Sequence, residues 1–291
     1  MMHPAERCEN QNTGRLECGS LFSQTAKLGS VMPFPLAHPA AILPFRRWSG
    51  TWLDFTALVI GAVTPDLSYC FLTDAGRYGV GGFAHSLHGC LGFSLPVGWI
   101  LTLLFYSVGG PLVERLPAPH RDVLEPHCRQ FPRLWCAIPL SVLVGAITHV
   151  FWDAFTHETG WFVERSTFLQ QSLFAGHGER FRTYRLLWHL GTWIGTILVS
   201  WSYVRAVKRR TGSSRLFLVK DAALYLKWLG VLLLPALVVL PFTLHSLGSG
   251  SWTSAASDRA LRAALAMYAI VLIAVLACGG AWLKAREREV G

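Results

Sequence analysis

The sequence predicts an all-α membrane protein, a polytopic bundle of about six transmembrane or re-entrant helices. The first observation is composition: of the 291 residues, 52% are hydrophobic and only 15% are charged, whereas roughly 25% are charged in ordinary soluble domains. The second is that the hydrophobic residues gather into long runs. The same composition excludes intrinsic disorder of the whole chain, because disordered chains are poor in apolar residues.

The chain changes character at Met32. Residues 1–31 are polar and irregular, and they lack the continuous apolar stretch of a signal peptide. We therefore expect 1–31 to be a disordered extension or to precede the true start of translation. The remainder is predicted to form a core helical domain over 32–206 and a C-terminal pair of transmembrane helices over 207–291.

Six apolar runs approach the ~20 residues that a helix needs to cross a bilayer. The first is short and contains Asp66, so it is also a candidate for a buried or re-entrant helix. The fourth contains Gly191 and Gly195, a GxxxG spacing that is typical of close helix packing in membranes. The runs are 55–72, 88–110, 134–157, 186–206, 224–245 and 261–283.

The basic residues indicate orientation in a membrane. Net charge is +9, but Lys and Arg lie mainly at the ends of the apolar runs, so we expect no nucleic-acid partner. The densest basic cluster, in 205–220, should be cytoplasmic, because cytoplasmic loops carry an excess of Lys and Arg. If the six runs all cross the membrane, counting them outwards from this loop predicts that both termini are cytoplasmic. Loop 158–185 departs from the rule, since it carries four Arg residues on the opposite side.

A stripe of ionisable residues marks the third run. Ionisable side chains inside membrane helices are costly and are functional candidates by default. The segment THVFWDAFTH places His149, Asp153 and His157 at i, i+4 and i+8, within about 80° of one helix face. Because His and Asp at i, i+4 can reach the same point, this pair can bind one metal ion.

Other His and Asp residues fall near the same membrane face in this topology. Asp66 lies late in the first run, His85 precedes the second and His189 begins the fourth. His38 joins them only if the first segment is re-entrant or if residues 39–45 fold back into the bundle. Imidazole and carboxylate ligands together suit Zn, Mn or Fe. None of the seven cysteines forms a CxxC pair, so no thiolate zinc site is expected.

Five segments together carry a family resemblance: MPFPLAHPAAILP, TPDLSY, AHSLHG, GAITHVFWDAFTHETGWFV and YRLLWHLGT. They resemble the uncharacterised bacterial membrane proteins grouped as domain of unknown function 4184. That family is distantly similar to membrane-bound metal-dependent hydrolases and to zinc-dependent phospholipase C. The resemblance implies a bacterial inner-membrane location and metal ligands at His38, Asp66, His85, His149 and Asp153, with His157 and His189 as further candidates.

The chain departs from the phospholipase pattern at two ligands. It has no processed N-terminal amine, and Trp193 stands where that pattern has a Glu. One or two ions are therefore expected rather than three. We expect a divalent metal, Zn first and Mn or Fe as alternatives, in a hydrolase acting on a lipid-borne or phosphoester substrate. Asp66 and Asp153 are the candidate catalytic carboxylates, as general base or by orienting a ligand His.

Two other functions remain open from the sequence. The same His and Asp residues would serve a transporter or a proton or metal relay, or they would form a structural network in a non-catalytic membrane protein. A hydrolase gathers its polar residues at one depth, whereas a transporter spreads them along a path through the bundle. The clustering towards one end favours the hydrolase.

Overall fold

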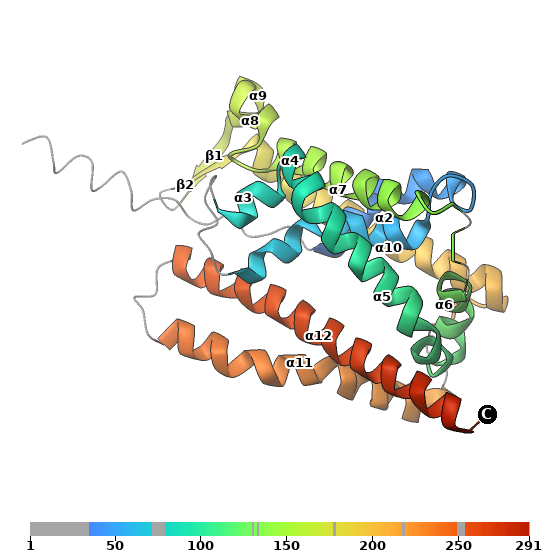
Figure 1. Ribbon diagram of the computed structural model, residues 1–291. Coiled ribbons are helices and arrows are strands. Elements are labelled where there is room, and N and C mark those ends of the chain that lie inside the picture. The colour runs from blue at the N-terminus through green and yellow to red at the C-terminus, as the bar shows by residue number, and fades with distance from the viewer. Residues whose placement is uncertain are drawn as a thin grey trace, which may run out of the picture.

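The computed structural model describes residues 35–71, 79–129, 131–132, 134–176, 179–216, 219–248 and 254–290. The predicted extension over 1–31 lies outside them, as do parts of loops 73–87 and 246–260. Helices dominate the described residues, which confirms the all-α prediction (Figure 1). One short antiparallel hairpin, β1–β2, interrupts the loop after the third apolar run and was not predicted.

The elements follow one another as short and long helices. The first part of the chain contains η1 (Pro35–Trp48), α2 (Phe55–Val63), η2 (Pro65–Phe71), α3 (Val80–Ala84), α4 (Leu87–Gly89), the π-helical turn η3 (Cys90–Ser94), α5 (Leu95–Glu114) and α6 (Ala118–Arg129). The second part contains α7 (Ala137–Thr156), α8 (Trp161–Arg165), α9 (Thr167–Gln170), β1 (Ser172–Gly176), β2 (Glu179–Arg182), α10 (Thr183–Thr211), η4 (Val219–Asp221), α11 (Ala222–Gly248) and α12 (Ser254–Val290).

Four helical segments among the described residues are long and apolar enough to cross a membrane, so the chain is a membrane protein. They correspond to the second, third, fifth and sixth predicted runs: Leu87–Glu114, Ala137–Arg165, Ala222–Pro241 and Met267–Glu289. The count is four rather than about six for two reasons. Helix α10 has the length, but His189, Thr192 and Thr196 dilute its apolar stretch. The run 55–72 does not form one continuous helix.

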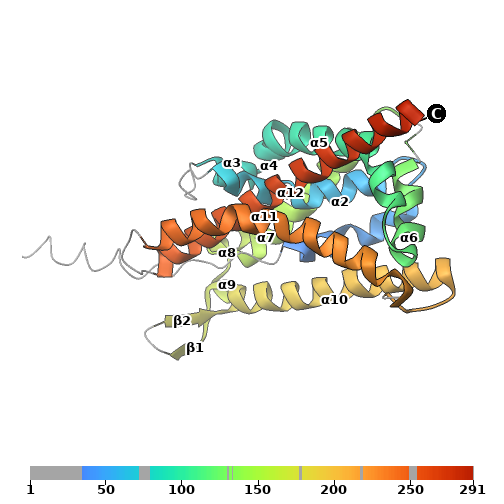
Figure 2. The same ribbon diagram turned by 90° about the horizontal axis from the view of Figure 1, so that it is seen from below.

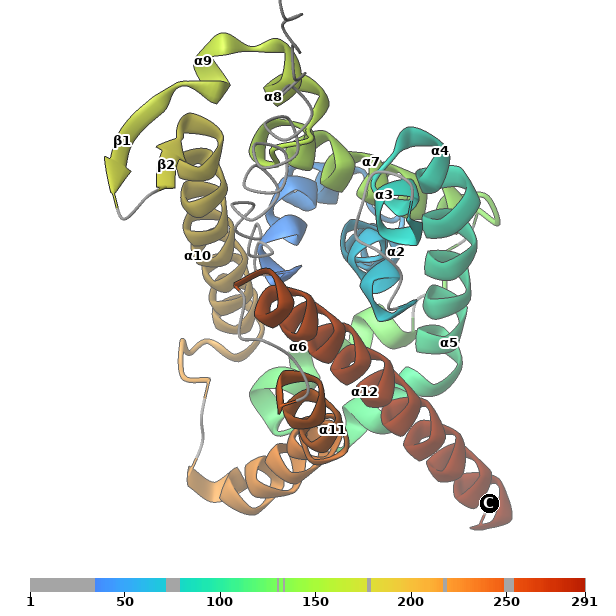
Figure 3. The same ribbon diagram turned by 90° about the vertical axis from the view of Figure 1, so that its left-hand side faces the viewer.

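The first predicted run is instead a broken, buried element. Asp54 caps α2 by accepting the Ala57 N–H at 2.7 Å, a common start for a helix. The α-helix ends before Pro65, which lacks the N–H needed to continue it. Leu58 and Ala62 are fully buried. The end-on view places η1 and α2 between α10 on one side and α5 on the other (Figure 3). The buried alternative left open by the sequence is therefore what the structure has.

Glycines allow α2 and α7 to cross at backbone contact. A Cβ atom added to Gly145 would overlap the Leu58 carbonyl of α2, and one added to Gly61 would overlap the Val142 carbonyl of α7. The GxxxG pair of α10 also allows close packing, as predicted. Gly191 packs against the Trp152 ring, and a Cβ at Gly195 would lie 2.8 Å from the Ala37 carbonyl oxygen of η1. These contacts hold η1, α2, α7 and α10 in one tightly packed group.

The bundle has two distinct ends. One end carries α3, α4, α8, α9 and the hairpin, whereas the other carries α6 and the C-terminus (Figure 1). Seen from below, α10 and the α11–α12 pair extend between the two ends (Figure 2). Helix α12 packs against α5 and η2, and α11 packs against α12. The long helices therefore connect the end that carries the hairpin, called the hairpin end, with the end that carries α6. We call the second the basic end, because Arg46, Arg47 and Lys208 to Arg210 lie in the last turns of η1 and α10.

Candidate metal centre

Five His and Asp side chains from four separate segments converge inside the bundle, towards the hairpin end. Two come from α7, and the others come from η1, η2 and the residue that follows α3. We call this group the His/Asp cluster; its members are His38, Asp66, His85, His149 and Asp153.

Helix α7 supplies the stripe expected from the helical repeat. His149 Nε2 lies 3.2 Å from Asp153 Oδ2, and His157 Nδ1 lies 3.5 Å from Asp153 Oδ1. His149 and Asp153 are buried. The His157 side chain is 21% exposed and follows the last residue of the helix, so it lies at the edge of the cluster.

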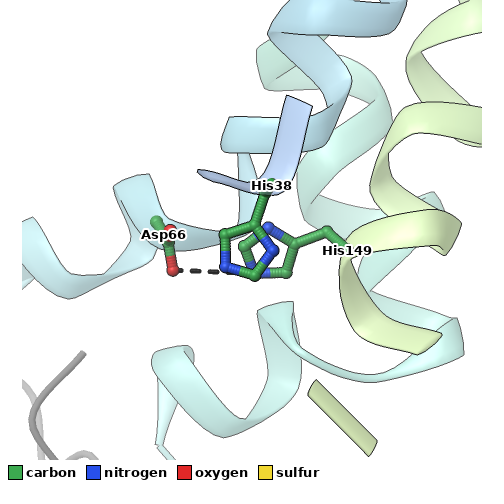
Figure 4. A group of neighbouring side chains, drawn as sticks. All are labelled: His38, Asp66 and His149. Atoms are coloured by element: carbon green, nitrogen blue, oxygen red, sulfur yellow. Dashed lines mark ion pairs between the residues drawn. The ribbon is translucent and has the colours of Figure 1, made fainter. Parts of the chain in front are cut away.

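The two short helices beside α2 deliver His38 and Asp66 to the same place. The His38 ring stacks on that of His149 with 3.8 Å between ring centroids, and Asp66 Oδ1 lies 3.6 Å from His149 Nε2 (Figure 4). Prolines set the local backbone: Pro39 keeps the preceding His38 from continuing an α-helix, and Pro65 begins the turn that carries Asp66. Segment 39–45 folds back into the bundle, which was one of the two conditions for His38 to join.

Hydrogen bonds to backbone carbonyls fix the ring tautomers of two histidines. His149 Nδ1 lies 2.8 Å from the Ala62 carbonyl oxygen at the end of α2, and His85 Nδ1 lies 2.8 Å from the Gly81 carbonyl oxygen. Since a carbonyl only accepts, each Nδ1 donates a proton. In the neutral rings Nε2 then carries the lone pair, and it faces the carboxylates at 3.2–3.7 Å. Histidine ligands of metals are typically oriented in this way.

Several polar atoms of the cluster are buried without a hydrogen-bond partner among the described residues. They are the Nε2 atoms of His38 and His149, Asp66 Oδ2 and Asp153 Oδ1. Leaving a buried polar group unsatisfied costs ~1–3 kcal/mol, and more if it is charged. Two ligand sets have their donor atoms within 4.8 Å of one another: His38, Asp66 and His149, and His85, His149 and Asp153. A divalent cation would satisfy these atoms.

The environment of His38 favours a neutral imidazole. Burial, followed by the nearby His149 ring, lowers the pKa of His38 from its ordinary value to about 4. A neutral ring offers a nitrogen lone pair at pH 7, which is the form that binds metal ions.

The structure does not bring every predicted residue to the cluster. His189 is exposed on α10, where its ring packs against Phe181 and Trp188. Gly191 and Gly195 set the packed face of α10, and His189 lies about 200° around the helix from Gly191.

A second buried polar group was missed from the sequence. Asp54 accepts a 2.6 Å hydrogen bond from the Tyr106 hydroxyl, and the Asp54 N–H donates to Ser141 Oγ at 2.7 Å. This group ties α2 to α5 and α7. An Asp directly before an apolar run is a helix-capping signal and could have pointed to Asp54. Its partners lie far along the chain, and no spacing rule identifies them.

Comparison with known proteins identifies one family. The family model described as Domain of unknown function (DUF4184) matches residues 32–283. No curated protein and no solved structure matches the chain. The matched range includes every member of the His/Asp cluster, three of the four apolar segments and most of the fourth, Met267–Glu289. Because the match covers most of its length, the chain belongs to the DUF4184 family.

Proposed function

We propose that this protein is a membrane-embedded metal-dependent hydrolase that acts on a lipid-borne phosphoester. The supporting observation is the His/Asp cluster, in which nitrogen and oxygen donors from four segments lie close together and four buried donor atoms lack a hydrogen-bond partner among the described residues. Buried charges of this kind are paired or coordinate metals. The resemblance of the family to metal-dependent hydrolases agrees with this reading.

The geometry favours one ion held through His149. Both ligand sets include His149, whose Nδ1 is already bonded to the Ala62 carbonyl. Only the lone pair on Nε2 remains, and a single lone pair binds a single ion. The two sets are then parts of one coordination shell, with the carboxylates free to reorient as the ion enters.

The donor chemistry favours Zn, Mn or Fe over calcium or copper(I). The cluster offers three imidazoles and two carboxylates. Imidazole is a common ligand of Zn and Fe, whereas Ca²⁺ prefers all-oxygen shells and Cu⁺ prefers sulfur. We propose Zn first.

The residues of the cluster would have different roles in hydrolysis. A bound ion would lower the pKa of a coordinated water towards ~7 and polarise a phosphoryl oxygen. Asp66 has one oxygen facing His85 at 3.4 Å, while its Oδ2 has no hydrogen-bond partner among the described residues. Oδ2 can therefore accept a proton from the attacking water. His157, partly exposed beside Asp153, can pass a proton from the Asp153 carboxylate to solvent.

The position of the cluster suits a substrate in the membrane. It lies towards the C-terminal end of α7, close to the hairpin end of the bundle. Basic residues gather at the other end, including Arg46 and Arg47 in the last turn of η1 and Lys208 to Arg210 in that of α10. The positive-inside rule places that end in the cytoplasm. We therefore propose an inner-membrane protein with a cytoplasmic C-terminus and the cluster towards the outer face; since η1 runs from His38 to Arg46, the described chain begins on the side of the cluster.

A relay through the bundle is the main alternative, and one observation weighs against it. The second buried polar group, around Asp54 and Ser141, lies about 12 Å along α7 from His149. Between Ser141 and His149, the buried side chains of α7 are those of Val142 and Ala146. Along α7, the described residues therefore include no buried polar side chain that would connect the two groups.

Turnover by metal-loaded protein tests this function. Full-length protein is stripped with a chelator, reloaded with Zn²⁺, Mn²⁺ or Fe²⁺, and incubated with phospholipid and lipid phosphate in mixed micelles. We expect metal-dependent product release, measured by mass spectrometry of the lipids. His149→Ala should lower the rate by about 100-fold or more, because loss of a ligand exceeds the ~10–100-fold effect of a supporting partner.

His189→Ala is the matched control, since it removes an exposed imidazole outside the cluster. It should retain the wild-type rate. Metal-loaded wild type that hydrolyses neither lipid, or equal rates for wild type and His149→Ala, would contradict a hydrolase at this site.

A further inference from the structure

An apolar cavity of about 520 Å³ adjoins the His/Asp cluster. Helices α5 and α12, which run side by side (Figure 1), form most of its lining, with contributions from α2, η2 and Trp228 of α11. We call it the α5–α12 groove. Asp66 is the only charged residue among the described residues that line it; the others are apolar, among them Leu101, Leu104, Val108, Leu272 and Leu276.

Asp66 lies at one end of this groove. Helix α2 runs antiparallel to α5, because Tyr106 bonds Asp54 before α2 while Gly98 packs against Thr64 after it. Asp66 follows Thr64 and therefore lies beyond the Leu101 end of the lining. At the other end, Trp228 donates a 3.0 Å hydrogen bond to the Arg115 carbonyl. The groove thus runs from the cluster towards the basic end of the bundle.

The length of the groove is close to that of a lipid chain. From Leu101 to Val113, both in its lining, helix α5 rises about 18 Å. The hydrocarbon core of a bilayer is ~30 Å thick, so one leaflet is about 15 Å. Both α5 and α12 contain membrane-crossing segments. The groove therefore lies within the membrane-crossing part of the bundle and is long enough for a lipid chain.

The volume of the groove, about 520 Å³, suits a small ligand such as a single hydrocarbon chain. The volume is within the ~300–1,000 Å³ typical of small-molecule sites. A water-soluble phosphoester would gain nothing from this apolar lining.

We propose that the α5–α12 groove binds a long hydrocarbon chain of a membrane lipid and thereby places that lipid's polar group beside Asp66 and the cluster. The identification of this lipid as the substrate rests on the proposed hydrolase function, whereas binding of the chain does not. Asp66 joins the two sites, because it lines the groove and also lies 3.4 Å from His85 and 3.6 Å from His149.

Photo-crosslinking in nanodiscs tests the proposal. The probe is a single-chain C16 lysophospholipid with a diazirine in its chain, and labelled peptides are mapped by mass spectrometry. We expect labelling of α5 and α12 peptides that line the groove. Ala269→Trp, which fills the groove from α12, should lower this labelling by about tenfold or more. Ala274→Trp is the matched control, because Ala274 is exposed on the same helix and lies outside the lining; it should leave labelling unchanged.

The controls separate this proposal from the hydrolase. Chelator-treated protein should be labelled as strongly as metal-loaded protein. Labelling of the groove without lipid hydrolysis would support the lipid-binding proposal and contradict only the hydrolase proposal. Equal labelling of both Trp variants, or labelling spread evenly over outward-facing helix surfaces, would show surrounding bilayer lipid only and would overturn the proposal. If Ala269→Trp lowers the apparent Tm, Leu104→Trp, which fills the groove from α5, replaces it.

Discussion

Gly145→Ala is expected to destabilise the bundle strongly although it adds only one methyl group. The new Cβ would overlap backbone atoms of Leu58 and Ala62 in α2, and backbone cannot move aside like a flexible side chain. Separating α2 from α7 would also break the bond between His149 and the Ala62 carbonyl. Overpacking of this kind costs ~3 kcal/mol, which corresponds to a fall of about 10 °C in apparent Tm.

Gly110→Ala provides the comparison within another long helix. A Cβ at Gly110 would have no atom within 4 Å among the described residues, and replacing a helical Gly with Ala ordinarily gains ~0.5–1 kcal/mol. Its apparent Tm, measured by scanning fluorimetry in the same detergent, should match or exceed that of the wild type. If Gly145→Ala melted at the same temperature as Gly110→Ala, the close crossing of α2 and α7 would be wrong.

Asp153→Asn is expected to lower metal affinity by about 100-fold or more, because the carboxylate is shared among more rings than any other group of the cluster. Its oxygens lie 3.2–3.9 Å from nitrogen atoms of His38, His85, His149 and His157. Asn keeps the shape of the side chain but removes the negative charge that balances a cation.

Competition with a chromophoric chelator would measure this loss. His157→Ala, which removes a partner of Asp153 at the edge of the cluster, should cost less, about tenfold. Unchanged affinity in Asp153→Asn would show that the metal binds elsewhere in the chain.

Local rules predicted the parts of this molecule that depend on one helix. The stripe of His149, Asp153 and His157 follows from the helical repeat alone, and these residues do lie on one side of α7. The four apolar helices follow from length and composition. Both features are set within about 20 consecutive residues.

Features that depend on contacts between segments were harder to predict. His38 reaches the cluster because η1 packs against α10 at Gly195 and against α2 through Ile42. His189 misses it because the packed face of α10 is set by Gly191, two residues further along. A sequence pattern gives the depth of a residue in the membrane, but helix rotation depends on the neighbouring helices. The run 55–72 illustrates the same limit. The sequence of an apolar helix buried in the protein core resembles that of a helix that faces lipid, so sequence alone does not distinguish the two.

The metal content of the purified protein tests the central claim most directly. Elemental mass spectrometry would compare detergent-purified wild type, after reconstitution with metal, with the variant His149→Ala/Asp153→Ala. A cluster that holds one ion through His149 predicts about one Zn, Mn or Fe per wild-type chain and almost none in the double variant. Folded wild type without metal, or equal metal in both proteins, would contradict a metal centre at the His/Asp cluster.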